Sequence, residues 1–156
     1  MKKNLLAILV FSVAVLMSSC GFEDGAGYVN DILVERTDKV EALLLEAFNH
    51  IDVDEYDSAL AYPDSVTNHV KESEVVIAKL KNKSAEKLQQ ATLEYLAMFK
   101  TGVIDCKQAI ECYRADGNME EAYDLINNFV EKADTKLEEM QEIQVEFAKA
   151  NNIILK

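Results

Sequence analysis

Apolar residues recur at alternating steps of four and three along most of this chain, a spacing typical of amphipathic α-helices. One unbroken stripe comprises Leu88, Thr92, Tyr95, Phe99, Gly102, Cys106, Ala109 and Tyr113. The 156 residues include one proline and five glycines, so the turn signals that a β-sandwich or β-barrel needs are scarce. The sequence therefore predicts an all-α fold.

Four segments carry such stripes and are expected to be helices, at residues 28–51, 55–81, 85–115 and 119–151. The stripe of the first comprises Val29, Leu33, Arg36, Val40, Leu43, Ala47 and His50. The stripe of the second comprises Ala59, Pro63, Val66, Val70, Ser73, Ile77 and Leu80. The stripe of the fourth comprises Met119, Ala122, Ile126, Phe129, Ala133, Leu137, Met140, Gln144 and Phe147. Ser84 is expected to cap the start of the third helix. Gly117 is expected to end that helix in the left-handed conformation. Asn118, followed three residues later by Glu121, has the spacing of a capping box and predicts the start of the fourth helix.

The connections between these helices set the expected topology. Residues 82–84 and 116–118 are short loops, which make consecutive helices antiparallel neighbours. Steps of about 3.5 residues favour packing at crossing angles of about 20°. We therefore expect an up-down-up-down antiparallel four-helix bundle with long helices. Pro63 either starts a helix over residues 63–81 or kinks a longer one. In the first case residues 52–62 cover one end of the bundle irregularly, and such a cover can form a groove.

The first twenty residues differ from the rest of the chain. Lys2 and Lys3 precede an apolar run from Leu5 to Met17, thirteen residues with one polar member, Ser12. A helix needs about 20 residues to span roughly 30 Å of hydrocarbon, so this run is too short to cross a membrane. Its length and its positive flank are typical of a secretory signal peptide.

The apolar run ends in Met17-Ser18-Ser19-Cys20. This pattern resembles bacterial lipoprotein precursors, in which a branched apolar residue and two small residues precede an invariant cysteine. Met17 stands where leucine is usual. The resemblance implies cleavage between Ser19 and Cys20, a diacylglyceryl group on the Cys20 thiol and an acyl chain on the new amine. Chains of this kind would hold the protein at a bilayer, since each buried CH₂ contributes about 0.8 kcal/mol.

The same resemblance divides the chain into a signal peptide at 1–19, a lipidated cysteine with a flexible tether at 20–27, and a helical domain at 28–156. Gly21 stands where an aspartate tends to retain lipoproteins at the inner membrane, which implies the outer membrane. Glu23 and Asp24 resemble the acidic tags that some bacteria use for surface display. A plain polar tether would have the same composition.

Acidic residues dominate the charge of the chain. There are 28 Asp and Glu against 16 Lys and Arg, and the formal net charge is -12. A phosphate backbone would be repelled, so we expect no nucleic-acid partner. Tryptophan is absent and histidine occurs twice, so we expect no cofactor. Neither a Gly-x-Ser-x-Gly motif nor a phosphate-cradling glycine loop is present, and the sequence predicts no enzyme.

Two cysteines follow Cys20, and both lie on the third expected helix. Cys106 and Cys112 are six residues apart, about 9 Å along a helix axis. A disulfide needs Cα atoms within about 7 Å, so the two are expected to stay unpaired. Cys106 lies on the core stripe, where it acts as a small apolar residue. Cys112 lies off the stripe, and a reactive or intermolecular role for it stays open.

The histidines lack the surroundings of a metal or haem site. A di-iron bundle needs Glu-x-x-His motifs, and neither His50 nor His69 has a glutamate three residues before it. Both are expected to be packing or capping residues. Arg36 lies on an apolar stripe, where its guanidinium should reach water or pair with a carboxylate. Gly102 should allow close approach of a second helix near Phe99, or mark a bend.

Two groups of carboxylates are expected to be solvated. Asp52, Asp54, Glu55 and Asp57 form the densest cluster, but they do not follow an EF-hand pattern. We expect an interhelical loop there, with weak binding of a divalent ion as the alternative. The second group lies on the last helix and comprises Glu131, Asp134, Glu138, Glu139 and Glu142.

These observations together predict a non-enzymatic lipoprotein, anchored by lipid at the outer membrane and facing the periplasm or the cell surface. It resembles small all-helical bacterial surface lipoproteins of unassigned activity. Its expected partners are the membrane, through the N-terminal lipid, and other envelope or surface proteins. The alternative is a binding module for a small apolar ligand or peptide near residues 52–62. An enzyme or metal protein, and self-association through spare apolar faces, are further alternatives.

Overall fold

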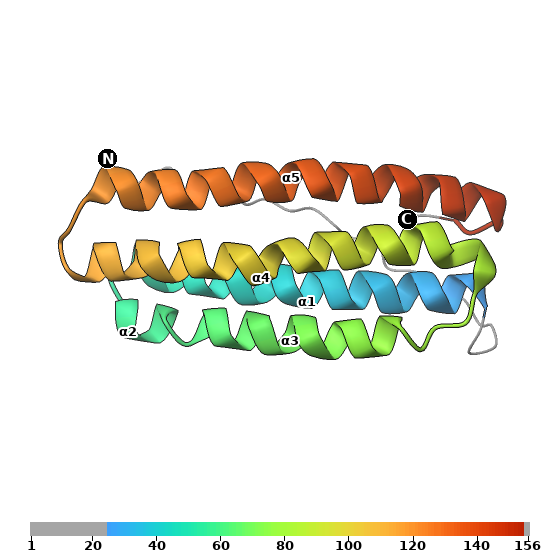
Figure 1. Ribbon diagram of the computed structural model, residues 1–156, viewed down its shortest axis with the longest axis horizontal. Helices are drawn as coiled ribbons and strands as arrows, with labels where there is room; N and C mark the ends of the chain where they lie inside the picture. Colours follow the sequence, from blue (N-terminus) through green and yellow to red (C-terminus); the bar gives the residue numbers. More distant parts are fainter. Residues whose placement is uncertain (1–24, 155–156) are drawn as a thin grey trace.

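The computed structural model describes residues 25–154, and all regular structure in this range is helical. Four long helices pack together along the length of the molecule (Figure 1). They are α1 (Ala26–Asp52), α3 (Tyr62–Ile77), α4 (Glu86–Arg114) and α5 (Met119–Ala150). The short helix α2 (Tyr56–Ala59) and the 3-10 turn η1 (Lys83–Ala85) lie between them in the sequence. The prediction of an all-α fold with four packed helices is confirmed.

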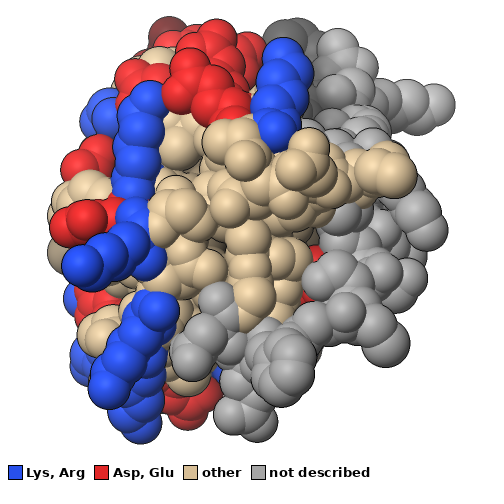
Figure 2. Space-filling model, turned by 90° about the vertical axis from the view of Figure 1, so that its right-hand side faces the viewer, with Lys and Arg blue, Asp and Glu red and all other residues tan. Residues whose placement is uncertain are grey.

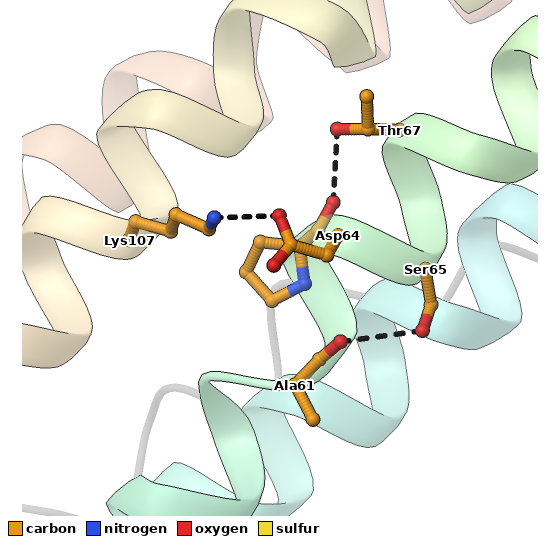
Figure 3. A network of polar contacts seen from close by, with 6 residues as sticks. Ala61, Asp64, Ser65, Thr67 and Lys107 are labelled. Carbon is orange, nitrogen blue, oxygen red and sulfur yellow. Dashed lines mark hydrogen bonds and ion pairs between the residues drawn. The ribbon is translucent and has the colours of Figure 1, made fainter.

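The second expected segment consists of two helices rather than one. Pro63 lies in the first turn of α3, where its missing N–H leaves no helical hydrogen bond unmade. The first of the two alternatives for Pro63 is therefore correct. In this turn Thr67 Oγ1 donates to the Pro63 carbonyl at 3.0 Å. Asp64 accepts from Lys107 Nζ of α4 at 2.6 Å, so the start of α3 is tied to a second helix (Figure 3).

Two sequence predictions about helix ends are wrong. Ser84 does not cap α4, because it lies inside η1 and its own N–H donates to Asn82 Oδ1 at 3.0 Å. Gly117 is not left-handed; Asp116 takes that conformation, with φ of 47°. The Gly117 N–H then donates to the Cys112 carbonyl at 2.9 Å, which closes the helix end. Aspartate tolerates the left-handed region because its short side chain can bond locally.

Other boundaries lie close to those expected. The side chain of Asn118 accepts from the Glu121 N–H at 3.2 Å, as predicted for the start of α5. Helix α1 begins at Ala26, so the expected tether and the helix overlap at Ala26 and Gly27. Helix α3 ends at Ile77 rather than near residue 81, which lengthens the connection to α4.

The core follows the predicted stripes closely in α3, α4 and α5. Large side chains such as Tyr95, Phe99 and Ile126 are buried there. Gly102 allows close helix approach, as predicted, because the Phe129 ring lies where a side chain would stand. The rings of Phe99 and Phe129 also meet edge to face, with centroids 5.5 Å apart.

The stripe predicted for α1 is partly wrong. Arg36 and His50 are only half-buried, whereas Thr37 and Glu41 are buried. The buried positions Val29, Leu33, Thr37, Val40, Leu44, Phe48 and Ile51 follow steps of four, four and three. A straight helix drifts by about 20° per heptad against a repeat of 3.5 residues, so a long stripe rotates toward this pattern.

Candidate functional site

The expected lipid attachment site, Cys20, and the expected cleavage position, Ser19, lie outside the described residues. The described chain begins at Gly25, and α1 begins at Ala26. None of the helices in the described range has the length and hydrophobicity that crossing a membrane requires.

An open groove lies at the end of the bundle that residues 52–62 cover. It measures about 410 Å³ and is lined by Asp54, Glu55, Tyr56, Asp57, Ser58 and Arg114. Three of its six lining residues are carboxylates, so the surface it offers is mainly polar. The groove therefore has the size expected for a ligand site, but its lining does not favour an apolar ligand.

Local contacts hold this end in place. His50 Nδ1 lies 2.7 Å from Glu55 Oε2, and His50 Nε2 lies 3.3 Å from the Tyr62 hydroxyl. His50 thus joins the end of α1 to the start of α3 through side-chain atoms, which fits the packing role rather than the capping role of the two that were expected. The Tyr56 hydroxyl donates to Asp54 Oδ1 at 2.6 Å, and this hydrogen bond is the main cause that raises the pKa of Tyr56 to about 12.

The carboxylates around the groove remain in solvent. Asp52, Asp54, Glu55 and Asp57 are all exposed, as predicted for a solvated loop. Asp57 Oδ1 lies 3.2 Å from Arg114 NH2, so α4 contributes a cation to the same surface. Across residues 25–154, no three His, Cys, Asp or Glu side chains are grouped so that they could hold a metal ion.

A buried carboxyl group inside the bundle was missed by the sequence analysis. Glu41 of α1 is 8% exposed, and its Oε1 accepts a hydrogen bond from the Tyr95 hydroxyl of α4 at 2.7 Å. Burial raises the pKa of Glu41 to about 7, and the nearby negative charges of Asp38 and Asp134 add to the shift. Burial, with Glu41 beside it, also raises the pKa of Tyr95. Of this pair, the Glu41 carboxyl is therefore the group that titrates near neutrality.

A second buried polar contact joins α1 to α5. Gln144 Nε2 donates to Asn30 Oδ1 at 2.9 Å, and both side chains are buried. Gln144 lies on the stripe predicted for α5, but Asn30 lies on no predicted stripe. Thr92 also lies on a predicted stripe, and its hydroxyl donates to the Leu88 carbonyl of its own helix at 2.8 Å. A polar residue within a helical stripe is the one signal that could have found these contacts.

The cysteines of α4 are unpaired, as predicted. Cys106 is buried, and burial raises the pKa of its thiol to about 12, so the reactive thiolate is strongly disfavoured. Cys112 is half-buried beside the core. Neither cysteine is therefore placed as an obvious nucleophile.

Arg36 and His69 meet where α1 packs against α3. His69 Nε2 donates to the Arg36 carbonyl at 3.3 Å, and burial lowers the pKa of His69. Arg36 is half-buried, and it forms no ion pair within the described range. Its Nε is buried without a hydrogen-bond partner among the described residues, so neither role expected for the guanidinium, reaching water or pairing with a carboxylate, is shown. The histidine has a packing role, as predicted.

The predicted acidic face of α5 is solvated. Glu131, Asp134, Glu138, Glu139 and Glu142 are all exposed. Lys136 Nζ lies 2.5 Å from Glu139 Oε2, and no ion pair is formed by the other four within the described residues. The face therefore presents negative charge that a basic partner could contact.

No protein-family model, curated protein or solved structure matches this chain.

Proposed function

We propose that this protein is a lipid-anchored, acidic helical-bundle lipoprotein of the bacterial outer membrane. The observation that carries the proposal is the order of features at the N-terminus: two lysines, a thirteen-residue apolar run, and Met17-Ser18-Ser19-Cys20. In this proposal Cys20 becomes the first residue of the mature protein and bears the lipid. The helical domain then lies at the periplasmic face of the outer membrane or at the cell surface.

We further propose that the four long helices alternate in direction, as an up-down-up-down bundle. Pairs of contacts support this for each neighbouring pair of helices. Between α4 and α5, Lys87 contacts Glu146 and Gln108 contacts Glu121, so higher numbers in α4 meet lower numbers in α5.

The other two neighbouring pairs of helices follow the same rule. Between α3 and α4, Asp64 contacts Lys107 and Glu74 contacts Lys100. Between α1 and α3, His50 contacts Tyr62, while the Arg36 carbonyl accepts from His69.

The proposed role is contact with other envelope or surface proteins rather than catalysis. Several polar contacts of the described residues join one helix to another, both at the surface and in the core, which supports a structural use of these side chains. The exposed carboxylates of α5 supply a surface for recognition. A partner that binds this face would carry basic groups at complementary spacing.

The test of the lipid anchor is mass spectrometry of the protein extracted from its native membrane fraction. The expected N-terminal fragment begins at Cys20 and carries the mass of a diacylglyceryl group and a further acyl chain. The Cys20→Ser variant should keep its leader and lose the lipid, with the same helical content by circular dichroism. A native chain that begins elsewhere, or an unmodified sulfur at position 20, contradicts the proposal.

Partners and self-association are tested on the same extract. Chemical crosslinking followed by mass spectrometry should join exposed α5 carboxylates to lysines of an envelope protein. Light scattering of the extracted protein reports the oligomeric state, and a mass of two chains would favour self-association as the role.

A binding role for the groove beside residues 52–62 is the second candidate, and its size favours it. Its carboxylates and Arg114 suit a polar peptide. If Arg114→Gln abolishes crosslinking to a partner while charge reversal on α5 does not, the groove is the binding surface.

A further inference from the structure

Lysines gather at one end of this acidic molecule. Residues 78–87 hold four lysines and one glutamate, although the whole chain has a formal net charge of -12. We define the lysine rim as Lys79, Lys81, Lys83, Lys87 and Lys149, all of which are exposed. Figure 2, which looks onto this end, shows basic side chains along one side of it.

Hydrogen bonds join the two parts of the chain that form the rim. Ser84 Oγ donates to Asn151 Oδ1 at 3.1 Å, so the connection before α4 is tied to the end of α5. The Ser84 N–H donates to Asn82 Oδ1 at 3.0 Å, which fixes the turn that carries the lysines. Lys149 of the last α5 turn therefore lies on the same end as Lys79, Lys81 and Lys83.

Most rim lysines keep their charge available. Within the described residues, Lys87 is the one rim lysine with an ion pair, at 2.8 Å from Glu146 Oε2. Further along the bundle, Lys100, Lys107 and Lys136 each contact a carboxylate. Lys39, Lys71 and Lys132 on the sides of the bundle are also without an ion pair among the described residues, so what sets the rim apart is that its lysines lie together at one end.

The surroundings of the rim suit a membrane surface. Lys83 and Lys87 line an open groove of about 620 Å³ together with two glutamates and four uncharged residues. These are Glu86, Glu94, Ser84, Gln90, Ala91 and Ile143. Ile154, just beyond the end of α5, is 76% exposed. An apolar side chain beside lysines is the arrangement found where proteins meet a bilayer.

The same end of the bundle carries the start of α1 (Figure 1). Ala26, the first residue of α1, follows Cys20 by six residues, and six residues of fully extended chain span at most about 21 Å. A lipid on Cys20 therefore holds the first residue of α1 within about 21 Å of the bilayer. The rim lies at the same end of the bundle, so it is farther away by at most the width of that end. Screening removes attraction beyond about 8 Å at physiological salt, so such a tether is what makes a weak patch effective.

We propose that the lysine rim seats this end of the bundle on an anionic phospholipid surface. The inference rests on the proposed lipid anchor, because the anchor brings the rim close enough to act. A lysine at such a surface contributes about fivefold to association, so several together set the orientation of the domain. The acidic sides of the bundle are then held away from the bilayer, by repulsion, and face possible partners.

The test is lysine acylation of the full chain, extracted from membranes and reconstituted into vesicles of neutral phosphatidylcholine or of phosphatidylcholine with phosphatidylglycerol. Mass spectrometry gives the acylation rate of each lysine and, from the same sample, the mass of the N-terminal fragment. We expect Lys79, Lys81 and Lys83 to react about fivefold more slowly on the anionic vesicles, since the surface covers them. High salt should remove most of this difference.

Three exposed lysines outside the rim, Lys39, Lys71 and Lys132, serve as internal controls and should react equally on both vesicle types. Equal rates at the rim on both vesicles overturn the proposal. Slowing of all lysines alike also overturns it, because it indicates general adsorption. Inorganic phosphate added to neutral vesicles is the last arm, and equal protection there assigns the rim to a soluble anion instead of the bilayer.

Two matched variants complete the test. In Lys79→Gln/Lys81→Gln/Lys83→Gln, the remaining rim lysines should lose their protection on anionic vesicles. In Lys39→Gln/Lys71→Gln/Lys132→Gln, which removes the same charge, protection at the rim should persist. The N-terminal mass separates the two proposals: an unacylated Cys20 contradicts the lipid anchor and with it the rim proposal that rests on it, whereas equal labelling rates on a chain with an acylated Cys20 contradict the rim proposal alone.

Discussion

Two seams of the bundle are built from different chemistry. Between α4 and α5 lies an aromatic seam, made of Phe99, Gly102 and Phe129, in which one ring lies directly on a glycine. The contacts of α1 with α4 and α5 include a polar seam, made of Asn30, Glu41, Tyr95 and Gln144. The interface between α4 and α5 is much more extensive than the interface of α1 with either of them.

The two seams contribute differently to the fold. Because Gly102 has no side chain, α4 and α5 come close together there. The resulting stabilisation scales with the apolar surface area that is removed from water. A buried hydrogen-bonded pair adds little net stability, but it is lost when one helix slides along another. The aromatic seam therefore supplies stability, while the polar seam selects the register of α1 and links stability to pH.

The largest expected effect is at the aromatic seam. Phe129→Ala should lower the free energy of unfolding by about 3–5 kcal/mol, because it removes a buried ring and leaves a cavity. Urea denaturation followed by circular dichroism measures the loss. Tyr123→Ala, on the exposed side of the same helix, is the control and should change little. A loss below about 0.5 kcal/mol for Phe129→Ala would mean that the seam is wrongly assigned.

The next effect belongs to Glu41 and depends on pH. Below about pH 4.5 the carboxyl is protonated in both the folded and the unfolded chain, so burial has no ionisation cost. Between about 4.5 and 7 the unfolded chain ionises first, so stability falls as pH rises, and above about 7 the loss is complete.

Glu41→Gln should therefore be more stable than the parent protein by about 2–3 kcal/mol at pH 8 and equal to it near pH 4. Gln keeps an acceptor for the Tyr95 hydroxyl, so the difference isolates the charge. Denaturation curves at both pH values measure it. An equal difference at the two pH values would show that Glu41 does not titrate between them.

Gly102→Ala should destabilise the protein by about 1–3 kcal/mol, because the new methyl group meets the Phe129 ring. The sign is the informative part. Alanine in an unobstructed helix would instead stabilise by about 1 kcal/mol. In the Phe129→Leu background the penalty should shrink, and a double-mutant cycle measures this coupling. Independent effects of the two substitutions would place the close contact elsewhere.

The smallest effect is expected at the polar contact between α1 and α5. Gln144→Leu should cost about 1 kcal/mol, because it leaves the Asn30 amide oxygen buried without its donor. Asn30→Leu with Gln144→Leu should recover most of this loss, since neither side of this contact then buries an unpaired polar group. If the double variant is less stable than the single one, packing rather than the hydrogen bond sets the cost.

The sequence allowed most of the aromatic seam to be predicted and little of the polar one. Phe99, Gly102 and Phe129 lie on regular stripes, and apolar periodicity directly reports a face that leaves water. Glu41 and Asn30 carry no such signal, because a polar residue becomes a core residue only through a partner on another helix. The pattern of steps in α1 hid them further, since the stripe rotates along a helix of this length.

Turns and the N-terminal site show the other limits of prediction. The left-handed position at the end of α4 was assigned to Gly117 and belongs to Asp116, because several residues near a helix end can take that geometry. The groove beside residues 52–62 was expected. The presence of Arg114 in its lining was not, because it depends on the end of α4 packing beside that segment. The lipid site at Cys20 stays a prediction, because it lies outside the described residues.

The proton on Glu41 gives this domain an unusual response to acidity. Many proteins loosen in acid because their paired carboxylates lose charge. Here mild acidification instead protonates the buried Glu41 carboxyl, whose negative charge is costly in the interior. The contribution of Glu41 to the free energy of unfolding would thus make the domain more stable in mildly acidic conditions than in alkaline ones.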